Sequence, residues 1–404
     1  MQTMTPSKKI VLLYADTGGG HRSTAQAVQQ ALQQLYGNAY DLHLVNGTAF
    51  MPYPFNQAEI AYPFFVNRAR MTYQAFWRVT NNYWHTATAR HYIEWKGREK
   101  ARLFLQQHPA QVYVSCHPIV NQVVPGIIKK FAPNAAVLSV VSDLVTVHAG
   151  FWTPKIDHYC VPTAQARQRA IQNHIAPRKI TVTGQPVLPD FAARVRQRRA
   201  QPGPDATSRS TVLVMGGGDG MGRLIETTLA LANSALPIRV VVVCGRNAQA
   251  RQLLLNAHTR VPMEVLGFCE NVPELMGDAD VLVTKAGPGS ICEGFVAGLP
   301  ILMYDAVPGQ ETGNIDYVVS RGAGAWCPSP QKVLDQLTQW LRSPDILQQL
   351  HRASAALAQP DSALRIAEII SRFATPLASA ISADSSQFNS EFARPKQMLA
   401  NVEV

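Results

Sequence analysis

An apolar run, a glycine turn and a helix-forming stretch follow one another twice in this sequence, and this order constrains the fold most strongly. The first copy reads KKIVLLYADTGGGH, and the second reads STVLVMGGGDGMG. Strand, turn and helix in this order form the first unit of a parallel α/β sheet. Later runs are apolar throughout, as buried parallel strands are. They are residues 111–115, 136–141 and 158–161, then RVVVVCG, MEVLG, ADVLVTKAG and LPILMYD. The sequence therefore predicts an α/β protein with two Rossmann-like parallel-sheet domains.

A change of composition marks the boundary between the two domains. The 404 residues are enough for two separate cores. The stretch ARVRQRRAQPGPDATSRS is rich in Arg, Gln, Pro, Gly and Ser, as linkers are. The segments that we expect are a first domain over 1–195, a linker over 196–210, a second domain over 211–345, closing helices over 346–374 and a mobile tail over 375–404.

The net charge and the cysteine spacing limit which binding partners and which cellular compartment can be expected for the protein. A formal charge of +10 indicates a negatively charged partner, which could be nucleic acid, an anionic bilayer or a phosphorylated substrate. The six cysteines show no CxxC spacing, which favours reduced thiols over a zinc site or a disulfide framework. The early apolar run, Ile10 to Ala15, is too short for a signal peptide, and no stretch has the roughly 20 apolar residues of a membrane span. We expect a cytoplasmic protein with peripheral membrane contact.

The first glycine turn, Gly18 to Gly20, ends in His21 at the start of a helix. Glycines let a ligand approach the backbone closely, and a helix N-terminus favours anions. The same glycines would also suit a tight turn that only needs positive φ. His21 favours the functional interpretation, because a histidine at such a turn can transfer a proton or orient a substrate.

The second glycine turn, Gly216 to Gly222, resembles a dinucleotide fingerprint at first sight. A dehydrogenase would carry an acidic ribose ligand at the end of the next strand, roughly 20 residues on. That strand ends instead in Cys244-Gly245-Arg246-Asn247. The pattern therefore argues against a dehydrogenase.

The stretch TKAGPGSICE predicts a phosphate-binding loop at a helix N-terminus. Backbone N–H groups of Gly287 to Ser290 and the Ser290 hydroxyl would face a diphosphate. Glu293 lies one turn into the helix, where a carboxylate can accept both hydroxyls of a ribose. Alternatively, Ser290 and Glu293 fit a capping box. Further on, the amide and carboxylate of PGQETGN can bind sugar hydroxyls at the carboxyl end of a strand, although an ordinary polar loop would look similar.

Asp143 ends the expected strand SVVSD in the first half and precedes Thr146 and His148. A carboxylate at a strand end beside a cleft is a candidate general base, or a partner that orients the base. A helix N-cap or turn aspartate would give the same pattern. His117, in SCHP, is a weaker candidate for lining the acceptor side.

Aromatic residues are concentrated between Phe50 and Phe104, which include 14 of the 32 in the chain. Eight basic residues are interleaved with them: Arg68, Arg70, Arg78, Arg90, Lys96, Arg98, Lys100 and Arg102. Aromatic anchors with basic side chains favour docking to lipid headgroups. Nucleic acid would also accept stacking with cations, and some of these rings must belong to the core.

Taken together, these motifs resemble the monogalactosyldiacylglycerol synthase family, which is related to diacylglycerol glucosyltransferases and, more distantly, to the transferase that makes lipid II. The matching pieces, between about Ile10 and Gly324, are DTGGGHRSTAQA, SCHP, SDLVTVH, VTGQPV, GGGDGMG, VVCGRN, TKAGPGSICE and PGQETGN. Two departures are Phe151-Trp152, where the family more often has the Trp first, and Asp219, where it often has Glu. The first of these puts details of lipid contact in doubt.

The resemblance implies a GT-B fold with two domains facing a cleft, the acceptor and membrane bound by the first and the nucleotide-sugar by the second. It implies an inverting transfer without a metal ion or other cofactor. The implied catalytic residues are His21 and Asp143, with the choice of base left open. The implied donor-binding residues are Gly19, Gly20, Gly217, Gly218, Arg246, Asn247, Phe268, Gly287, Pro288, Gly289, Ser290, Glu293, Gln310 and Glu311. The implied acceptor-side residues are His117, His148 and Trp152.

The activity that we expect is transfer of galactose from UDP-galactose to the 3-hydroxyl of diacylglycerol. A UDP-glucose-dependent diacylglycerol glucosyltransferase is the second hypothesis, and lipid II synthesis is the third. A different class, a peripheral lipid-binding protein without catalysis, is disfavoured because the donor loop, His21 and Asp143 are all present. The expected partners are a UDP-hexose, diacylglycerol and the anionic inner face of the cell membrane, with no nucleic acid.

Overall fold

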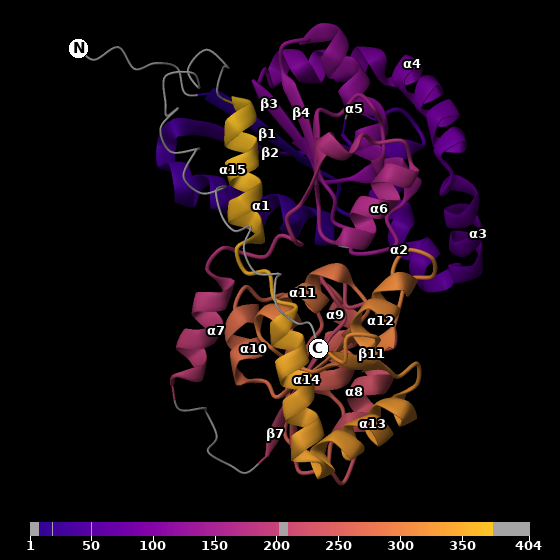
Figure 1. Ribbon diagram of the computed structural model, residues 1–404. Helices are drawn as coiled ribbons and strands as arrows, with labels where there is room; N and C mark the ends of the chain where they lie inside the picture. The colour runs from indigo at the N-terminus through magenta and orange to yellow at the C-terminus, as the bar shows by residue number, and fades with distance from the viewer. Residues whose placement is uncertain (1–7, 18, 50, 202–208, 375–404) are drawn as a thin grey trace, which may run out of the picture.

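The computed structural model describes residues 8–17, 19–49, 51–201 and 209–374, which form two stacked α/β domains (Figure 1). The first domain holds six parallel strands in the order β2-β1-β3-β4-β5-β6. They are β1 (Lys8–Tyr14), β2 (Tyr40–Asn46), β3 (Val112–Ser115), β4 (Ala136–Val140), β5 (His158–Val161) and β6 (Ile180–Val182). The order reverses between β1 and β3, and open α/β sheets bind ligands beside the carboxyl ends of strands at such a point.

Helices cover both faces of this sheet because its strands are apolar on both sides. In β1, Ile10 and Leu12 pack under one helical layer, while Val11 and Leu13 pack under the other. The first layer consists of α1 (Gly20–Tyr36) and α15 (Ser362–Ala374), and the second includes α4 (Tyr83–Gln107), α5 (Pro118–Phe131) and α6 (Ala164–Gln172).

The second domain repeats this construction with the strand order β12-β11-β10-β7-β8-β9, again all parallel. Its strands are β7 (Ser210–Met215), β8 (Ile238–Val243), β9 (Met263–Leu266), β10 (Val281–Lys285), β11 (Ile301–Asp305) and β12 (Gly324–Trp326). One face is covered by α8 (Leu224–Ala232), α9 (Ala248–Leu255) and α13 (Pro330–Arg342), the other by α7 (Phe191–Arg199), α10 (Val272–Asp278) and α11 (Pro288–Val296). The order reverses between β7 and β10. The expected α/β class with two Rossmann-like parallel-sheet domains is confirmed.

The helices α7 and α15 change the expected domain boundaries. α7 lies within the segments expected to be first domain and linker, yet it packs on α10 of the second domain, where Arg194 pairs with Glu274 and Arg198 pairs with Asp278. The chain then crosses back late: α14 (Pro344–Ala356) packs on the second domain, whereas α15 packs against α1 of the first (Figure 1). Residues 375–404, expected to be a mobile tail, lie outside the described residues, as do 202–208 of the expected linker.

Three helices in the chain between β2 and β3 contain the aromatic segment of the first domain. They are α2 (Ala58–Arg68), α3 (Arg70–Thr80) and α4, whose first turn is capped by the Asn82 side chain accepting from the Trp84 N–H at 2.9 Å. α2 and α3 lie at the edge of the first domain and reach down towards α12 (Thr312–Val319) of the second (Figure 1). The remaining short helices are η1 (Gly37–Ala39), η2 (Phe55–Gln57), η3 (Ala149–Phe151) and η4 (Pro177–Lys179).

Candidate active site

The two glycine turns, one at each point of strand reversal, face each other across the domain boundary. Gly19 has φ +80°, and a Cβ placed there would lie 3.4 Å from Arg246 Nη2 and 3.7 Å from Gly218 Cα. Arg246 donates to Asp219 Oδ1 from Nε at 2.9 Å, and its Nη2 lies 3.6 Å from Asp16 Oδ1 in the first domain. The two turns thus pack closely against each other, with Arg246 in contact with both.

His21 is buried in the first turn of α1 and makes its hydrogen bonds through Nδ1. This nitrogen lies 2.9 Å from the Cys116 carbonyl oxygen and 2.7 Å from Ser142 Oγ. Since a carbonyl only accepts, Nδ1 carries the proton and Nε2 is left as the basic nitrogen. Burial lowers the pKa of His21 to about 4, so the ring is neutral near pH 7.

His117 lies against His21, with ring centroids 4.4 Å apart in an edge-to-face arrangement. Its Nδ1 accepts the Ile119 N–H at 3.2 Å at the start of α5, so its Nε2–H donates to Thr17 Oγ1 at 3.0 Å. Burial lowers its pKa well below the usual value. The structure therefore places this residue beside the candidate base.

The other two residues expected on the acceptor side differ in their surroundings. His148 accepts the Gly150 N–H at Nδ1, and its Nε2 lies 3.1 Å from Thr80 Oγ1. Trp152 is fully buried and packs between Phe151 and Tyr159 in the core. The prediction for Trp152 is therefore wrong, because a side chain enclosed in the core is not exposed to an acceptor.

Asp143 is almost fully buried in the loop that follows β4, three residues after the strand ends at Val140. Burial raises the pKa of its carboxyl to about 7, against the opposing effect of hydrogen bonds from the Gln310 side chain and the His148 backbone. Gln310 Nε2 donates to Asp143 Oδ1 at 3.2 Å, which links the first domain to the second. The described hydrogen bonds thus connect Asp143 to Gln310, while Ser142 and Cys116 contact His21.

The glycine turn after β7 requires glycine for steric reasons. Gly220 has φ +56°, and a Cβ there would lie 2.1 Å from the Cys244 carbonyl oxygen. Asn247 supports the turn by donating from Nδ2 to the Gly220 carbonyl at 3.1 Å, while its Oδ1 caps α9 by accepting the Ala250 N–H at 2.9 Å. These contacts make Asn247 a support of the loop.

The loop before α11 leaves Ser290 and Glu293 free of a capping role. α11 begins at Pro288 with Gly287 as its N-cap, so Ser290 is three residues beyond the cap and the capping-box alternative is excluded. Burial raises the pKa of Glu293 to about 7. Phe268, which follows β9, is 64% exposed and presents its ring to solvent.

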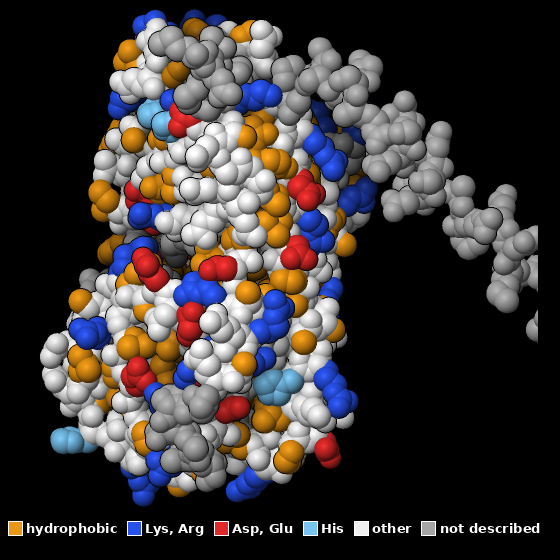
Figure 2. All heavy atoms as spheres, turned by 90° about the vertical axis from the view of Figure 1, so that its left-hand side faces the viewer, with side chains coloured by type: hydrophobic (Ala, Val, Ile, Leu, Met, Phe, Trp, Pro, Cys, Tyr) orange, Lys and Arg blue, Asp and Glu red, His pale blue; other side chains and the backbone are white. Residues whose placement is uncertain are grey.

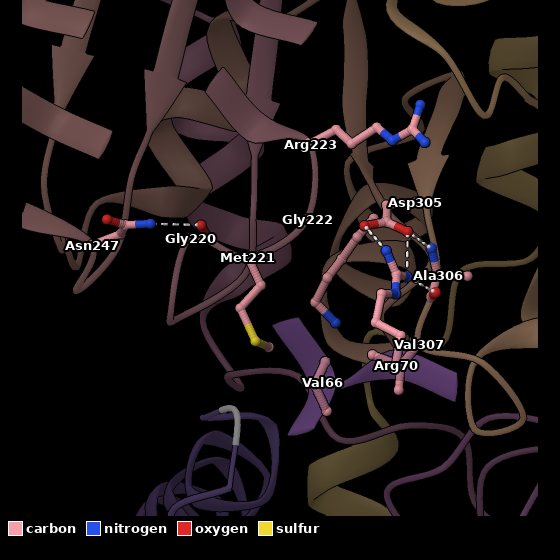
Figure 3. Close-up of a pocket in the computed structure, with 11 residues that line it drawn as sticks. Val66, Arg70, Gly220, Met221, Gly222, Arg223, Asn247, Asp305, Ala306 and Val307 are labelled. Carbon is pink, nitrogen blue, oxygen red and sulfur yellow. Dashed lines mark hydrogen bonds and ion pairs between the residues drawn. The ribbon is translucent and has the colours of Figure 1, made fainter. Parts of the chain in front are cut away.

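Lys285 and Glu311 form a buried ion pair between the loops of the second domain. Glu311 Oε2 also accepts the Val307 N–H at 2.8 Å, and Lys285 lies beneath Gly217 and Gly287. A cavity of about 320 Å³ adjoins this pair. Its lining comes from both domains: Val66, Arg70, Gly220, Met221, Gly222, Arg223, Asn247, Lys285, Asp305, Ala306 and Val307 (Figure 3).

Several residues of the site were not expected from the sequence to have the contacts that they make. Ser142 and Cys116 fix the His21 ring, and Tyr62, Tyr73 and Arg70 contact the second domain. Cys116 and Ser142 lie in the motifs SCHP and SDLVTVH, and the other three lie in the aromatic and basic segment that was expected to contact lipid. No local pattern indicates the contacts that these five side chains make. Within the described part of the chain, no group of three or more His, Cys, Asp or Glu side chains is arranged to hold a metal ion.

The aromatic helices expose a set of large apolar side chains and bury others. The exposed set, here called the apolar face, is Ile60, Phe64, Phe65, Met71, Phe76, Val79, Trp84, Tyr92, Trp95 and Leu103. Trp77, Phe104 and Arg90 are buried, so this segment also supplies core. Phe50 and the Arg68 side chain lie outside the described residues. None of the described helices is long and apolar enough to span a bilayer.

The net positive charge does not form one continuous patch on the face turned to the viewer in Figure 2. Basic and acidic side chains are interspersed there over both domains. Arg194 and Arg198 of α7 are paired with acidic residues of α10. Part of the positive charge is therefore neutralised locally.

Solved structures share this two-domain fold. MurG of Acinetobacter baumannii matches with a TM-score of 0.58 and 17% identity over 90% of this chain and 99% of that one. A UDP-GlcNAc 2-epimerase of Neisseria meningitidis bound to UDP-GlcNAc matches with a TM-score of 0.59 and 12% identity, over 90% of this chain and all of that one. Two parallel-sheet domains with facing strand ends define the GT-B class, and these likenesses agree with it.

Sequence comparison assigns the chain within that class. The model of monogalactosyldiacylglycerol (MGDG) synthase matches residues 21–187, and that of the glycosyltransferase family 28 C-terminal domain matches 211–364. The chain is therefore a UDP-sugar glycosyltransferase. A probable MGDG synthase of Nicotiana tabacum is 31% identical over 89% of this chain and 70% of its own. MGDG synthase 2 of Arabidopsis thaliana is 30% identical over 92% and 83%. The chain belongs to the monogalactosyldiacylglycerol synthase family.

One expectation about location is overturned by the same comparison. From its charge and its apolar runs we expect a cytoplasmic protein on the inner face of the cell membrane. The relatives from Nicotiana tabacum, Glycine max, Spinacia oleracea and Arabidopsis thaliana are all named chloroplastic. The prediction is therefore wrong: basic charge, and described helices too short or too polar to span a bilayer, do not distinguish one membrane-bounded compartment from another.

Proposed function

We propose that this protein transfers galactose from UDP-galactose to the 3-hydroxyl of 1,2-diacylglycerol, with inversion at the anomeric carbon. The names of its relatives support the product, monogalactosyldiacylglycerol. The observation that carries the chemistry is the buried, neutral His21 opposite the donor loops, with Nδ1 fixed by Cys116 and Ser142. An imidazole held in this tautomer keeps Nε2 available for a proton.

In the proposed reaction, His21 Nε2 removes the proton of the lipid hydroxyl as its oxygen attacks the anomeric carbon. The bond from that carbon to the UDP oxygen breaks on the opposite face, and UDP leaves with the electron pair. Two charges on the departing diphosphate favour the protonated imidazole nearby, which offsets the effect of burial on its pKa. Asp143 then acts as the partner that orients Gln310.

The leaving diphosphate is stabilised by backbone dipoles in this proposal, without a metal ion. The nine-residue α11 begins at Pro288, and its N-terminal N–H groups are not capped by any described side chain. Such N–H groups favour a diphosphate, and pre-oriented donors of this kind reduce the barrier. Glu293 is proposed to accept hydrogen bonds from the ribose hydroxyls of UDP. The exposed Phe268 is proposed to contact its uracil ring.

The lipid acceptor is proposed to arrive through the apolar face of α2, α3 and α4. Met71 is 86% exposed and Ile60 is 76% exposed, and exposed apolar side chains gathered in this number on three successive helices are typical of a surface that contacts a membrane or a partner. Aromatic rings on the same helices suit the headgroup region of a bilayer, and neighbouring basic residues favour anionic lipid. This proposal places the acceptor beside His148 and Thr80 on its path to His21.

The test is a transfer assay with purified protein and phosphatidylcholine vesicles that contain diacylglycerol, with and without anionic phosphatidylglycerol. UDP-galactose and UDP-glucose are supplied separately, and the glycolipid is identified by mass spectrometry. Formation of a monohexosyl lipid from UDP-galactose supports the proposal. A product from UDP-glucose alone would make the protein a glucosyltransferase, and no product from either would refute the lipid acceptor.

A further inference from the structure

Arg70 of α3 connects the first domain to the loop that carries Gln310 and Glu311. Its Nη1 donates to Asp305 Oδ2 at 3.1 Å, and its Nη2 donates to Asp305 Oδ1 at 2.6 Å and to the Ala306 carbonyl at 2.6 Å (Figure 3). A planar guanidinium that bonds both carboxylate oxygens fixes direction as well as distance. The start of the 305–311 loop is thus fixed by a residue of the other domain.

Gln310, at the other end of this loop, is also oriented from the first domain. Its Oε1 accepts the hydroxyls of Tyr62 at 3.3 Å and Tyr73 at 2.9 Å, and its Nε2 donates to Asp143 at 3.2 Å. The two hydroxyls use both lone pairs of the amide oxygen, and one N–H remains for a ligand. The amide therefore has one defined orientation, with a single donor left for a sugar hydroxyl.

Packing between these polar contacts closes the loop against α2 and α3. Gly309 has φ +85°, and a Cβ there would lie 2.8 Å from the Trp77 ring. Val66 of α2 packs with Met221 and Val307 of the second domain in a small buried cluster. Both ends and the middle of the 305–311 loop are therefore held by the same pair of helices.

We propose that α2 and α3 are a positioning element for the donor sugar and that Arg70 is its principal positioning residue, acting through Asp305. This inference rests on the proposed use of a UDP-hexose by this site. Arg70 is not assigned as a direct ligand of the diphosphate in this proposal, because three of its five N–H donors bond Asp305 and the Ala306 carbonyl. Its role is to hold Gln310 and Glu311 where a bound hexose meets them.

The test is a double-mutant cycle in the full chain: Arg70→Ala, Asp305→Ala and the pair together. Loss of a charge-assisted contact of this kind should raise KM for UDP-galactose roughly tenfold, with kcat changing less than about threefold. The effect of the double variant should be smaller than the product of the two single effects, since both substitutions break the Arg70–Asp305 contact, while each also removes one separate bond to Ala306. Arg70→Lys should fall in between, because an ammonium cannot form the two-pronged contact.

Arg178→Ala is the matched control, because it removes the same charge from an exposed position of the same domain. It should leave KM for UDP-galactose unchanged. Thermal unfolding of each variant shows that the fold is intact. Unchanged KM in Arg70→Ala, or effects that multiply in the double variant, would overturn the inference.

Failure of the proposed transfer reaction can be distinguished from failure of the positioning role of Arg70. A wild-type protein that makes no glycolipid refutes the transfer reaction, whereas calorimetric titration with UDP-galactose still measures binding. In that experiment Arg70→Ala must weaken the binding of UDP-galactose more than that of UDP, since the loop is inferred to hold the sugar. Equal weakening of both would overturn the positioning role.

Discussion

Replacing Asp143 with Asn should make the stability of the protein less dependent on pH. Burial raises the pKa of this carboxyl from 3.8 to about 7, whereas in the unfolded chain it titrates near its ordinary value of about 3.9. At any pH between the unfolded-state pKa and the folded-state pKa of Asp143, the folded protein binds more protons than the unfolded chain. The free energy of unfolding therefore falls as pH rises through this range. A shift of about three units corresponds to about 4 kcal/mol, fully present below about pH 4 and lost above about pH 7.

The Asn side chain keeps an oxygen that can accept from Gln310 and cannot ionise. At pH 8 Asp143→Asn should therefore unfold at a higher urea concentration than wild type, by up to about 4 kcal/mol in free energy. At pH 4.5 most of that difference should vanish. The assay is urea unfolding followed by circular dichroism at both values of pH, with the two proteins compared side by side. Because Glu293 and the other titrating groups are present in both proteins, they cancel in the comparison. An equal stability difference at both values of pH would refute the account of a carboxyl that is costly to ionise.

Three other substitutions test separate parts of the site. His21→Ala should lower kcat by roughly 10²- to 10⁴-fold, the range for loss of a general base, while KM for UDP-galactose changes little; a kcat within threefold of wild type would exclude His21 as the base. Gly220→Ala should destabilise the second domain, because its Cβ would lie 2.1 Å from the Cys244 carbonyl at φ +56°, and unaltered thermal unfolding would contradict that geometry. Glu293→Gln should weaken UDP binding about tenfold by calorimetry and remove its dependence on pH around 7, where the wild-type carboxylate gains its charge as pH rises. Wild-type affinity in this variant would exclude the ribose contact.

The elements that could be predicted from the sequence are those specified by local pattern. Ile10 to Leu13 are apolar at every position because helices cover both faces of β1, and the glycine turn that follows needs Gly19 at φ +80°. The donor loop was equally local, since Gly287 and Pro288 start α11 where a strand ends. Signals of this kind depend on residues within a few positions of one another.

Long-range packing decided what the sequence could not show. The polar sequence of α7 is typical of a linker, yet its Phe191 and Val195 side chains are buried. Its arginines pair with carboxylates 80 positions later in the chain. Trp152 follows a histidine motif, and only the folded core shows that its ring is enclosed. The contacts of Arg70 and Tyr73 with the 305–311 loop depend on how two independently patterned domains meet. No periodicity within either domain encodes them.

The stereochemistry of the lipid product is the most direct test of the central claim. Wild-type protein is incubated with diacylglycerol vesicles and UDP-galactose, and the purified glycolipid is examined by proton NMR. We predict a single galactose on the 3-hydroxyl with the β configuration, opposite to the α configuration of the donor. An α-linked galactolipid, or free galactose without any glycolipid, would contradict the account.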